Sequence, residues 1–169
     1  MTGPVEIRPA RTADVSGIRA LVDRYTSDRR VLSKATVTLY EDVQEFLVAE
    51  GPRGEVVGCG ALHVLWEDLA EVRTLVVAPE RAGHGVGSGL LSGLLERARR
   101  IGVEKVFCLT FETGFFAHHG FDVIDGTPVS HEVFEQLLQS YDEGVAEFLD
   151  LERVKPNTLG NVRMLLRLT

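Results

Sequence analysis

The chain has 169 residues, of which 44% are hydrophobic and 25% charged, and its 18 basic and 25 acidic side chains give a formal charge of −7. This length suits one ordinary domain, 1–169, whose core needs no disulfide or metal to hold it together. The acidic balance argues against a general nucleic-acid binder, and no window approaches the roughly 20 apolar residues that span a membrane. We therefore expect a soluble, cytoplasmic protein with neither a nucleic-acid nor a membrane partner.

The first half of the chain predicts a strand, a helix and a three-stranded antiparallel meander. Apolar residues alternate over 5–9, and Thr12-Ala13-Asp14 precedes an apolar face at helical spacing. The glycine-containing turn at 51–54 joins two apolar runs, as in a hairpin. The predicted elements are an edge strand at 5–9, a helix at 12–22, a loop at 26–34, a short helix at 40–46, and strands at 46–50, 55–65 and 70–77.

The second half begins with a glycine-rich turn at 81–89 and a helix that ends in basic residues before Gly102. The strand at 103–110 should run parallel to 70–77, because a helix connects the two. The remaining predicted elements are a short helix at 115–119, a strand at 121–124, a helix at 130–141 and a last strand at 162–168. The fold class is therefore mixed α+β with one mainly antiparallel sheet. The apolar stripe on 130–141 belongs in the core or in a homodimer contact.

Cys59 and Cys108 each lie inside an apolar run, with no second cysteine at C-x-x-C spacing. We expect both to be buried, reduced thiols, and we expect neither a structural zinc site nor a redox pair.

The stretch Gly83-His84-Gly85-Val86-Gly87-Ser88-Gly89 follows a strand and opens a helix. Backbone N–H groups in such a turn suit a phosphate or pyrophosphate, and the alternative is a merely flexible connection. A P-loop is excluded because no lysine occurs between Pro79 and Ile101. The dinucleotide fingerprint fails because Ser88 and Leu90 stand where its third glycine would be required.

This turn resembles the acyl-CoA loop of the GNAT acetyltransferase superfamily, whose pattern R/Q-x-x-G-x-G/A matches at Gly85-Val86-Gly87 but has Ala82 at its first position. Val77-Ala78-Pro79 before the loop and Gly120-Phe121 after the next strand resemble the superfamily as well. The resemblance implies a mixed, mainly antiparallel central sheet flanked by helices, with a parallel strand pair around the acetyl-CoA site. It implies acetyl-CoA as co-substrate, no metal, and cofactor contacts at Leu75, Val76, Val77, Ala82, Gly83, His84, Gly85, Val86, Gly87, Ser88, Phe116 and His119.

Residues 109–121 and 155–161, together with Val31-Leu32-Ser33-Lys34, resemble the short amino-acid N-acetyltransferases known as single-domain N-acetylglutamate synthases of actinobacteria. The resemblance implies acetylation of the α-amine of L-glutamate or L-glutamine, as in the first step of arginine biosynthesis. Acetylation of another amine, such as a polyamine, an antibiotic or a peptide N-terminus, stays open. So does a non-catalytic sensor that binds CoA or an amino acid.

Transfer of an acetyl group from a thioester to an amine requires a base, a donor for the oxyanion and help for the departing thiolate. Glu71 is the expected base, acting through water because it lies roughly 13 Å along its strand from Leu75; a solvated strand-end carboxylate is the alternative. The superfamily often places a tyrosine general acid four residues before Gly-Phe, where this chain has Phe116. Thr113 is the nearest hydroxyl, and it is equally suited to cap a helix.

A carboxylate-bearing substrate needs cations, and Lys34, Arg73 and Arg163 are the candidates, each with a plain surface charge as its alternative. Asn157 joins them from a segment that carries the family resemblance. His118 and His119 diverge by about 100 degrees on a helix, so they do not suggest a metal site. We expect them to flank the cofactor or to face solvent.

Overall fold

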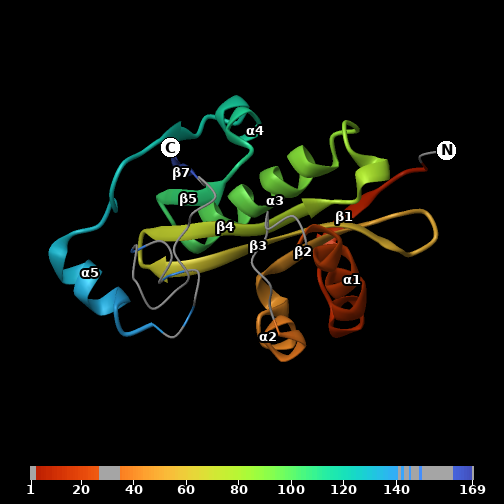
Figure 1. Ribbon diagram of the computed structural model, residues 1–169, viewed down its shortest axis with the longest axis horizontal. Coiled ribbons are helices and arrows are strands. Elements are labelled where there is room, and N and C mark those ends of the chain that lie inside the picture. The colour runs from red at the N-terminus through yellow and green to blue at the C-terminus, as the bar shows by residue number, and fades with distance from the viewer. Residues whose placement is uncertain are drawn as a thin grey trace. The chain divides into compact units, whose positions relative to one another are not determined.

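Strands and helices follow one another in the predicted order (Figure 1). The computed structural model describes residues 3–26, 35–140, 142, 145, 149 and 162–168. Its helical elements are η1 (Thr12–Asp14), α1 (Val15–Thr26), α2 (Thr36–Glu41), η2 (Val43–Glu45), η3 (Pro79–Arg81), α3 (Val86–Ile101), α4 (Thr113–His118) and α5 (His131–Leu137). Its strands are β1 (Glu6–Pro9), β2 (Phe46–Glu50), β3 (Val56–Trp66), β4 (Leu69–Val77), β5 (Lys105–Thr110), β6 (Asp122–Val123) and β7 (Val162–Arg167).

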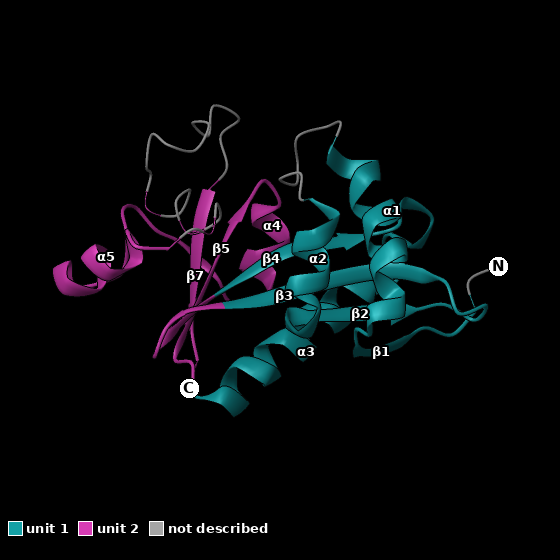
Figure 2. Cartoon of the chain, turned by 90° about the horizontal axis from the view of Figure 1, so that it is seen from below, with its two compact units in different colours: residues 1–63, 71–102 teal, residues 64–70, 103–169 magenta. Residues whose placement is uncertain are grey.

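The strands form one sheet in the order β1-β2-β3-β4-β5-β7-β6. The sheet is mostly antiparallel with a single parallel pair, β4 and β5, as the connecting helix predicts. The chain divides into two compact units, which Figure 2 colours separately. Unit 1 is residues 1–63 and 71–102, and unit 2 is residues 64–70 and 103–169.

In unit 1 the predicted hairpin is confirmed: β2 pairs with β3 in antiparallel register, with Phe46 opposite Ala61 and Ala49 opposite Gly58. The register shifts between Ala49 and Glu50, where the chain approaches the turn. β1 pairs only with β2 and forms an edge of the sheet, also as predicted. Within this unit α1 and α3 lie on opposite faces of the strands (Figures 1 and 2).

Within unit 1, helix α3 packs against the strands at glycine positions. A Cβ atom on Gly89 would lie 2.5 Å from Cδ1 of Ile7, and one on Gly93 would lie 2.7 Å from Cδ1 of Leu47. On the strand side, a Cβ on Gly58 would lie 3.0 Å from Cδ1 of Leu90. Real Cβ atoms do not approach neighbours so closely, so these glycines allow the helix and the strands to approach one another. The apolar spacing of residues 90–98 also predicts a buried helix face, and all five of its residues are buried: Leu90, Leu91, Leu94, Leu95 and Ala98.

The start of α1 is held by a half-buried ion pair. Arg8 on β1 donates two hydrogen bonds to the carboxylate of Asp14, at 2.8 and 2.9 Å, and a third to Glu50 at 3.2 Å. Asp14 also accepts the backbone N–H of Arg11 at 2.7 Å, which caps the first turn. One carboxylate therefore joins strand β1 to the helix start that Thr12-Ala13-Asp14 predicted.

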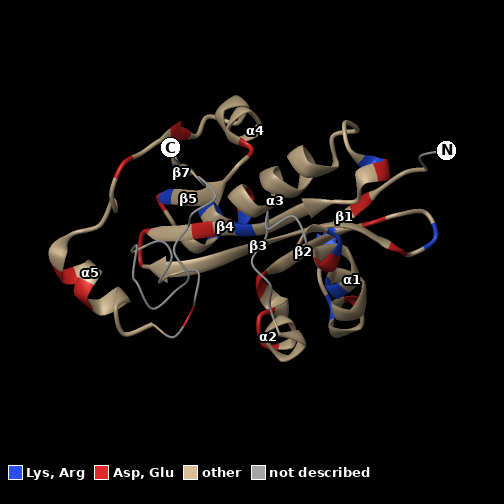
Figure 3. Ribbon diagram, viewed as in Figure 1, with Lys and Arg blue, Asp and Glu red and all other residues tan. Residues whose placement is uncertain are grey.

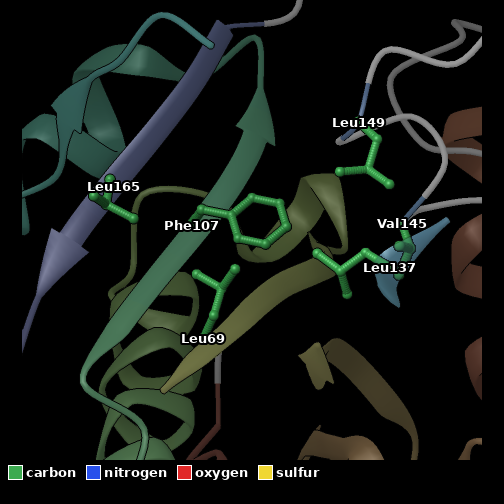
Figure 4. Packing of buried hydrophobic residues seen from close by; sticks show 6 residues of the cluster. All are labelled: Leu69, Phe107, Leu137, Val145, Leu149 and Leu165. Carbon is green, nitrogen blue, oxygen red and sulfur yellow. The ribbon is translucent and has the colours of Figure 1, made fainter. Parts of the chain in front are cut away.

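Unit 2 has its own core, built from six buried side chains (Figure 4). Phe107 on β5 and Leu165 on β7 lie opposite each other in an antiparallel pair. Leu137 from α5 joins them, and Val133 and Phe134 pack against the same cluster. The apolar stripe predicted for this helix therefore lies at least partly in the core. The cluster consists of Leu69, Phe107, Leu137, Val145, Leu149 and Leu165.

Several predicted boundaries were wrong. The helix expected at 40–46 is instead α2 followed by the 3-10 turn η2, because Asp42 ends the first and precedes the second. The glycine-rich turn was expected to run to Gly89, but α3 begins at Val86. β6 has two residues where four were expected, and β5 begins at Lys105 rather than at Val103. α5 begins after Ser130, whose hydroxyl caps it, and ends at Leu137.

Cys59 and Cys108 are both free and buried, as predicted. Burial raises the pKa of the Cys59 thiol to about 12. Within the ranges that the structure describes, no helix is long and apolar enough to cross a membrane.

The Arg8–Asp14 pair predicts a pH-dependent stability. The hydrogen bonds from Arg8 hold the pKa of the Asp14 carboxyl below its ordinary value, so its stabilisation is complete above about pH 4 and is lost as the pH falls through the lower, folded-state pKa. Asp14→Asn should lower the free energy of unfolding by about 2 kcal/mol at pH 7, and the difference from wild type should shrink below about pH 4.

Urea denaturation at pH 7 and pH 3 measures this difference. The control is Asp23→Asn, which breaks an exposed pair with Arg19 in α1 and should change the free energy of unfolding much less than Asp14→Asn does. A loss at pH 7 no greater than that of the control would contradict the role given to Asp14.

Candidate active site

Strand β4 leaves regular geometry at Thr74, three residues before its end. Thr74 has a φ of 56°, and it is the only residue other than glycine with positive φ in the described ranges. A β-branched residue in this region is strained by about 1–3 kcal/mol, and such strain commonly accompanies functional sites. Sequence reasoning missed this feature, because threonine is an ordinary residue in a strand.

Cys59 on β3 packs against this irregular stretch. Its thiol lies 3.5 Å from the carbonyl oxygen of Thr74, to which it donates, and its sulfur also interacts with the backbone of Val76. The side chain is fully buried. Cys59 therefore supports the backbone of Leu75–Val77, the segment predicted to contact acetyl-CoA, from the β3 side.

Acidic and basic positions lie close together along β4 (Figure 3). Glu71 and Arg73 form a buried ion pair on this strand. Arg73 donates from Nε at 2.8 Å and from Nη2 at 2.5 Å, and both bonds end on Oε1 of Glu71. The Glu71 residue is only 4% exposed, so the alternative of a solvated strand-end carboxylate was wrong. Oε2 accepts no hydrogen bond from the part of the chain that the structure describes.

This arrangement has two chemical consequences. A buried carboxylate needs a compensating charge, and the guanidinium of Arg73 supplies one. The carboxylate of Glu71 is a candidate proton acceptor. Arg73 was predicted to bind a substrate carboxylate, and it would have to share its guanidinium between that group and Glu71.

The chain after β4 enters η3, which begins at Pro79. Arg81 is 8% exposed, and its guanidinium donates to the carbonyl oxygen of Gly3 at 3.0 Å. This arginine, displaced by one residue from the superfamily pattern, therefore ties the start of the chain to the loop. Glu80 is exposed and pairs with Arg24 of α1 at 3.0 Å.

Gly83 and Gly85 have φ angles of 79° and 82°, in the left-handed region that favours glycine. A Cβ atom at either position would meet nothing within 4 Å. These glycines are therefore required for the backbone conformation and not for close packing. Ala82, Gly83, His84 and Gly85 are all exposed, so their backbone is open to a ligand.

Gly85 is the N-cap of α3, and because it has no side chain it makes no side-chain cap hydrogen bond. The carbonyl of Gly85 accepts the N–H of Gly89 at 3.0 Å, which is the first bond of the helix. Gly87 and Ser88 are half-buried and lie in its first turn, together with Val86. The Val86 side chain is 6% exposed and belongs to the core, so only its backbone can contact a cofactor. An uncapped N-terminus of a 16-residue helix is a favourable position for an anion.

In unit 2, Thr113 is the first residue of α4, and Glu112 occupies the N-cap position. The alternative that Thr113 is only a helix cap was therefore wrong. The Thr113 side chain is half-buried. The hydroxyl of Thr110, which accepts the N–H of Glu112 at 2.8 Å, holds the turn before the helix.

Phe116 and His119 both lie on or beside α4, in aromatic contacts. Phe116 is 6% exposed and packs edge-on against Phe115 and Phe121, with ring centroids 5.1 and 5.2 Å apart. His119 lies against Phe115 and His118. Burial, with a smaller effect from His118, lowers the pKa of His119. Cofactor contacts at these two residues remain a prediction.

Only some of the side chains predicted to bind the substrate lie within the described residues. Arg163 lies on β7 opposite Leu109, and it donates to the carbonyl oxygen of Gly126 at 3.2 Å. Lys34 and Asn157 lie outside the described residues. Among the described residues, no group of three or more His, Cys, Asp and Glu side chains could hold a metal ion.

Three comparisons connect this geometry to known proteins. The family model for acetyltransferases of the GNAT family matches residues 18–121, which include β4, the glycine loop and α3. An amino-acid acetyltransferase of Mycobacterium tuberculosis is 59% identical over 162 residues, covering 95% of this chain and 92% of the relative.

Solved structures give the same result. A crystal structure of a Mycobacterium tuberculosis protein in complex with CoA and NLQ has a TM-score of 0.93 and 58% identity, over 97% of this chain and 99% of that one. N-acetylglutamate synthase from Neisseria gonorrhoeae, complexed with coenzyme A and L-arginine, has a TM-score of 0.71 and 25% identity, over 98% of this chain but 34% of that one. The resemblance and the fold predicted from the glycine loop are confirmed, and the chain belongs to the GNAT family of acetyltransferases.

Proposed function

We propose that this protein is an amino-acid N-acetyltransferase that transfers the acetyl group of acetyl-CoA to the α-amine of L-glutamate or L-glutamine. The observation that carries the proposal is the arrangement of β4, which holds the buried Glu71–Arg73 pair and then leads into an exposed glycine loop and an uncapped helix. One strand therefore brings a proton acceptor and an anion-binding turn into the same unit. The high identity to an amino-acid acetyltransferase supports the amino-acid substrate.

The loop and the start of α3 fit the diphosphate of acetyl-CoA. Gly83 and Gly85 expose backbone without side-chain obstruction, and the N-terminal turn of α3 supplies partial positive charge. Backbone contacts suit this role because they bind the phosphates whatever side chains the loop carries, which explains how the loop tolerates Ala82 in place of arginine or glutamine.

Glu71 acts as the general base. An α-ammonium group must lose a proton before its nitrogen forms the new bond to the acetyl carbon, while the carbon–sulfur bond breaks. Oε2 of Glu71 accepts that proton through water, and Arg73 holds Oε1 in place. Thr113 remains our proposed source of a proton for the departing thiolate, because phenylalanine at position 116 has none to give.

Recognition of glutamate or glutamine is assigned to Arg163, Lys34 and Asn157, with Arg73 as a shared contact. NLQ, bound together with CoA in the solved relative from Mycobacterium tuberculosis, is consistent with an amino-acid-sized substrate. Production of N-acetylglutamate would place the enzyme in arginine biosynthesis in the cytoplasm.

Thiol release measured across a panel of amines tests the substrate. Glutamate and glutamine should give the highest kcat/KM, ahead of other amino acids, spermidine and kanamycin. A clear preference for a polyamine or aminoglycoside would contradict the substrate but leave the acetyltransferase assignment standing. Acetyl-CoA binding with no turnover of any amine would instead favour a sensor, the alternative that Phe116 supports.

Substitution of the base predicts a change in rate without a change in cofactor binding. Glu71→Gln keeps the size of the side chain but cannot accept the proton, so kcat should fall by roughly 10²-fold or more. The dissociation constant for acetyl-CoA, measured by isothermal titration, should stay within about twofold. Glu67→Gln, in the exposed turn between β3 and β4, is the matched control and should be unchanged. Wild-type turnover in the Glu71 variant would remove its assignment as the base.

Two variants at Gly85 separate charge from backbone strain. Asn and Asp have nearly the same shape and a similar cost at a φ of 82°, but only Asp carries a negative charge toward the proposed diphosphate. Gly85→Asp should bind acetyl-CoA about tenfold more weakly than Gly85→Asn at low ionic strength, and the ratio should fall as salt is added.

The control is the same pair of substitutions at Gly102, the C-cap of α3, where φ is 98° and a Cβ also meets nothing within 4 Å. Acetyl-CoA affinity should not differ between Gly102→Asp and Gly102→Asn. Equal affinities for the two Gly85 variants would show that the loop does not bind the diphosphate.

A further inference from the structure

We propose that Tyr25 is a positioning residue for acetyl-CoA. It fixes the Val77–Ala78 peptide, which connects the strand that binds the acyl end to the loop that binds the diphosphate. The inference rests on the proposed function, because it takes the cofactor to lie along Leu75–Val77 and Gly83–Val86. Tyr25 belongs to the last turn of α1, and its hydroxyl donates to the carbonyl oxygen of Val77, the last residue of β4.

The peptide group between Val77 and Ala78 is held from two sides. Its N–H, on Ala78, donates to the carbonyl oxygen of Val57 in β3 at 2.8 Å. Its carbonyl, on Val77, points the opposite way because the peptide is trans, and there it accepts the Tyr25 hydroxyl. One strand and one helix therefore fix the plane of a single peptide group.

The carbonyl of Val77 lies on the edge of β4 that is expected to bind the cofactor. Backbone groups of successive strand residues point to alternate edges, so Val77 presents its N–H and carbonyl on the edge away from β3. The N–H of Val77, which is predicted to contact acetyl-CoA, lies on that same edge. Tyr25 reaches it from α1 and occupies the acceptor of Val77, which would otherwise need another donor.

A second contact from α1 is weaker. Arg24 pairs with Glu80 in η3 at 3.0 Å, but 46% of the arginine and 63% of the glutamate side chain are exposed. Exposed pairs of this kind contribute little. Tyr25 is half-buried, so its hydrogen bond is less exposed to water than the Arg24–Glu80 pair.

The Tyr25 hydrogen bond acts at the point where β4 leads into the glycine loop. Acetyl-CoA has its thioester at one end and its phosphates at the other, and both ends bind together only if the strand and the loop keep a fixed separation. Linked contacts lose affinity when the geometry between them is relaxed, although each contact alone is unchanged. Loss of the Tyr25 hydroxyl should therefore weaken the whole cofactor more than a fragment that occupies one end.

Isothermal titration of Tyr25→Phe with acetyl-CoA and with ADP tests this inference. The variant keeps the ring and loses only the hydroxyl. The dissociation constant for acetyl-CoA should rise about fivefold, in the range expected for one hydrogen bond, while that for ADP stays within twofold of wild type. Tyr40→Phe is the matched control, because Tyr40 lies exposed on α2, and it should change neither constant.

Three outcomes of these titrations would contradict the inference. Unchanged acetyl-CoA affinity in Tyr25→Phe, with wild-type binding intact, would overturn the positioning role and leave the proposed function standing. Equal weakening of acetyl-CoA and ADP would also overturn it, because that result indicates a general loss of structure. Failure of the wild-type protein to bind acetyl-CoA would instead remove the proposed function, and this inference with it.

Discussion

The close approach of α3 to the strands of unit 1 is the constraint on which the rest of that unit depends. A Cβ atom on Gly89 or Gly93 would lie 2.5 or 2.7 Å from the terminal carbon of Ile7 or Leu47, so glycine lets α3 pack against β1 and β2 without moving those side chains. The exposed turn at Gly83 and Gly85 leads directly into this packed helix.

The Glu71–Arg73 pair shows how a charged group is retained within a buried strand. Removal of two charges from water is costly, and an apolar pair of similar size would pack there at least as well. The hydrogen bonds from Nε and Nη2 of Arg73 both end on Oε1 of the Glu71 carboxylate. Stability alone does not explain this arrangement, and the proposed role of Glu71 as a base that works through water gives it a reason.

Periodicity and turn residues predicted the fold well, because the core faces of α1, α3 and the strands follow simple spacing rules. Periodicity and turn residues predicted the glycine loop less well. Gly83 and Gly85 are needed for their positive φ angles and Gly89 for close packing, and composition alone does not distinguish these two roles. Three features depend on contacts between residues distant in sequence: the positive φ of Thr74, the hydrogen bond of Tyr25 and the burial of Glu71. No local sequence pattern predicts them. The family resemblance identified the loop, but the roles of Thr113, Phe116 and His119 remain predictions.

The two buried cysteines have a practical consequence for solution work on the enzyme. Cys59 and Cys108 are at most 1% exposed, and a thiol whose pKa is near 12 carries almost no thiolate at neutral pH. Thiol-specific reagents should therefore report released CoA without background from the folded protein. The same thiols become reactive when their strands separate. Because Cys59 lies in unit 1 and Cys108 in unit 2, the rate at which each thiol reacts reports the unfolding of its own unit.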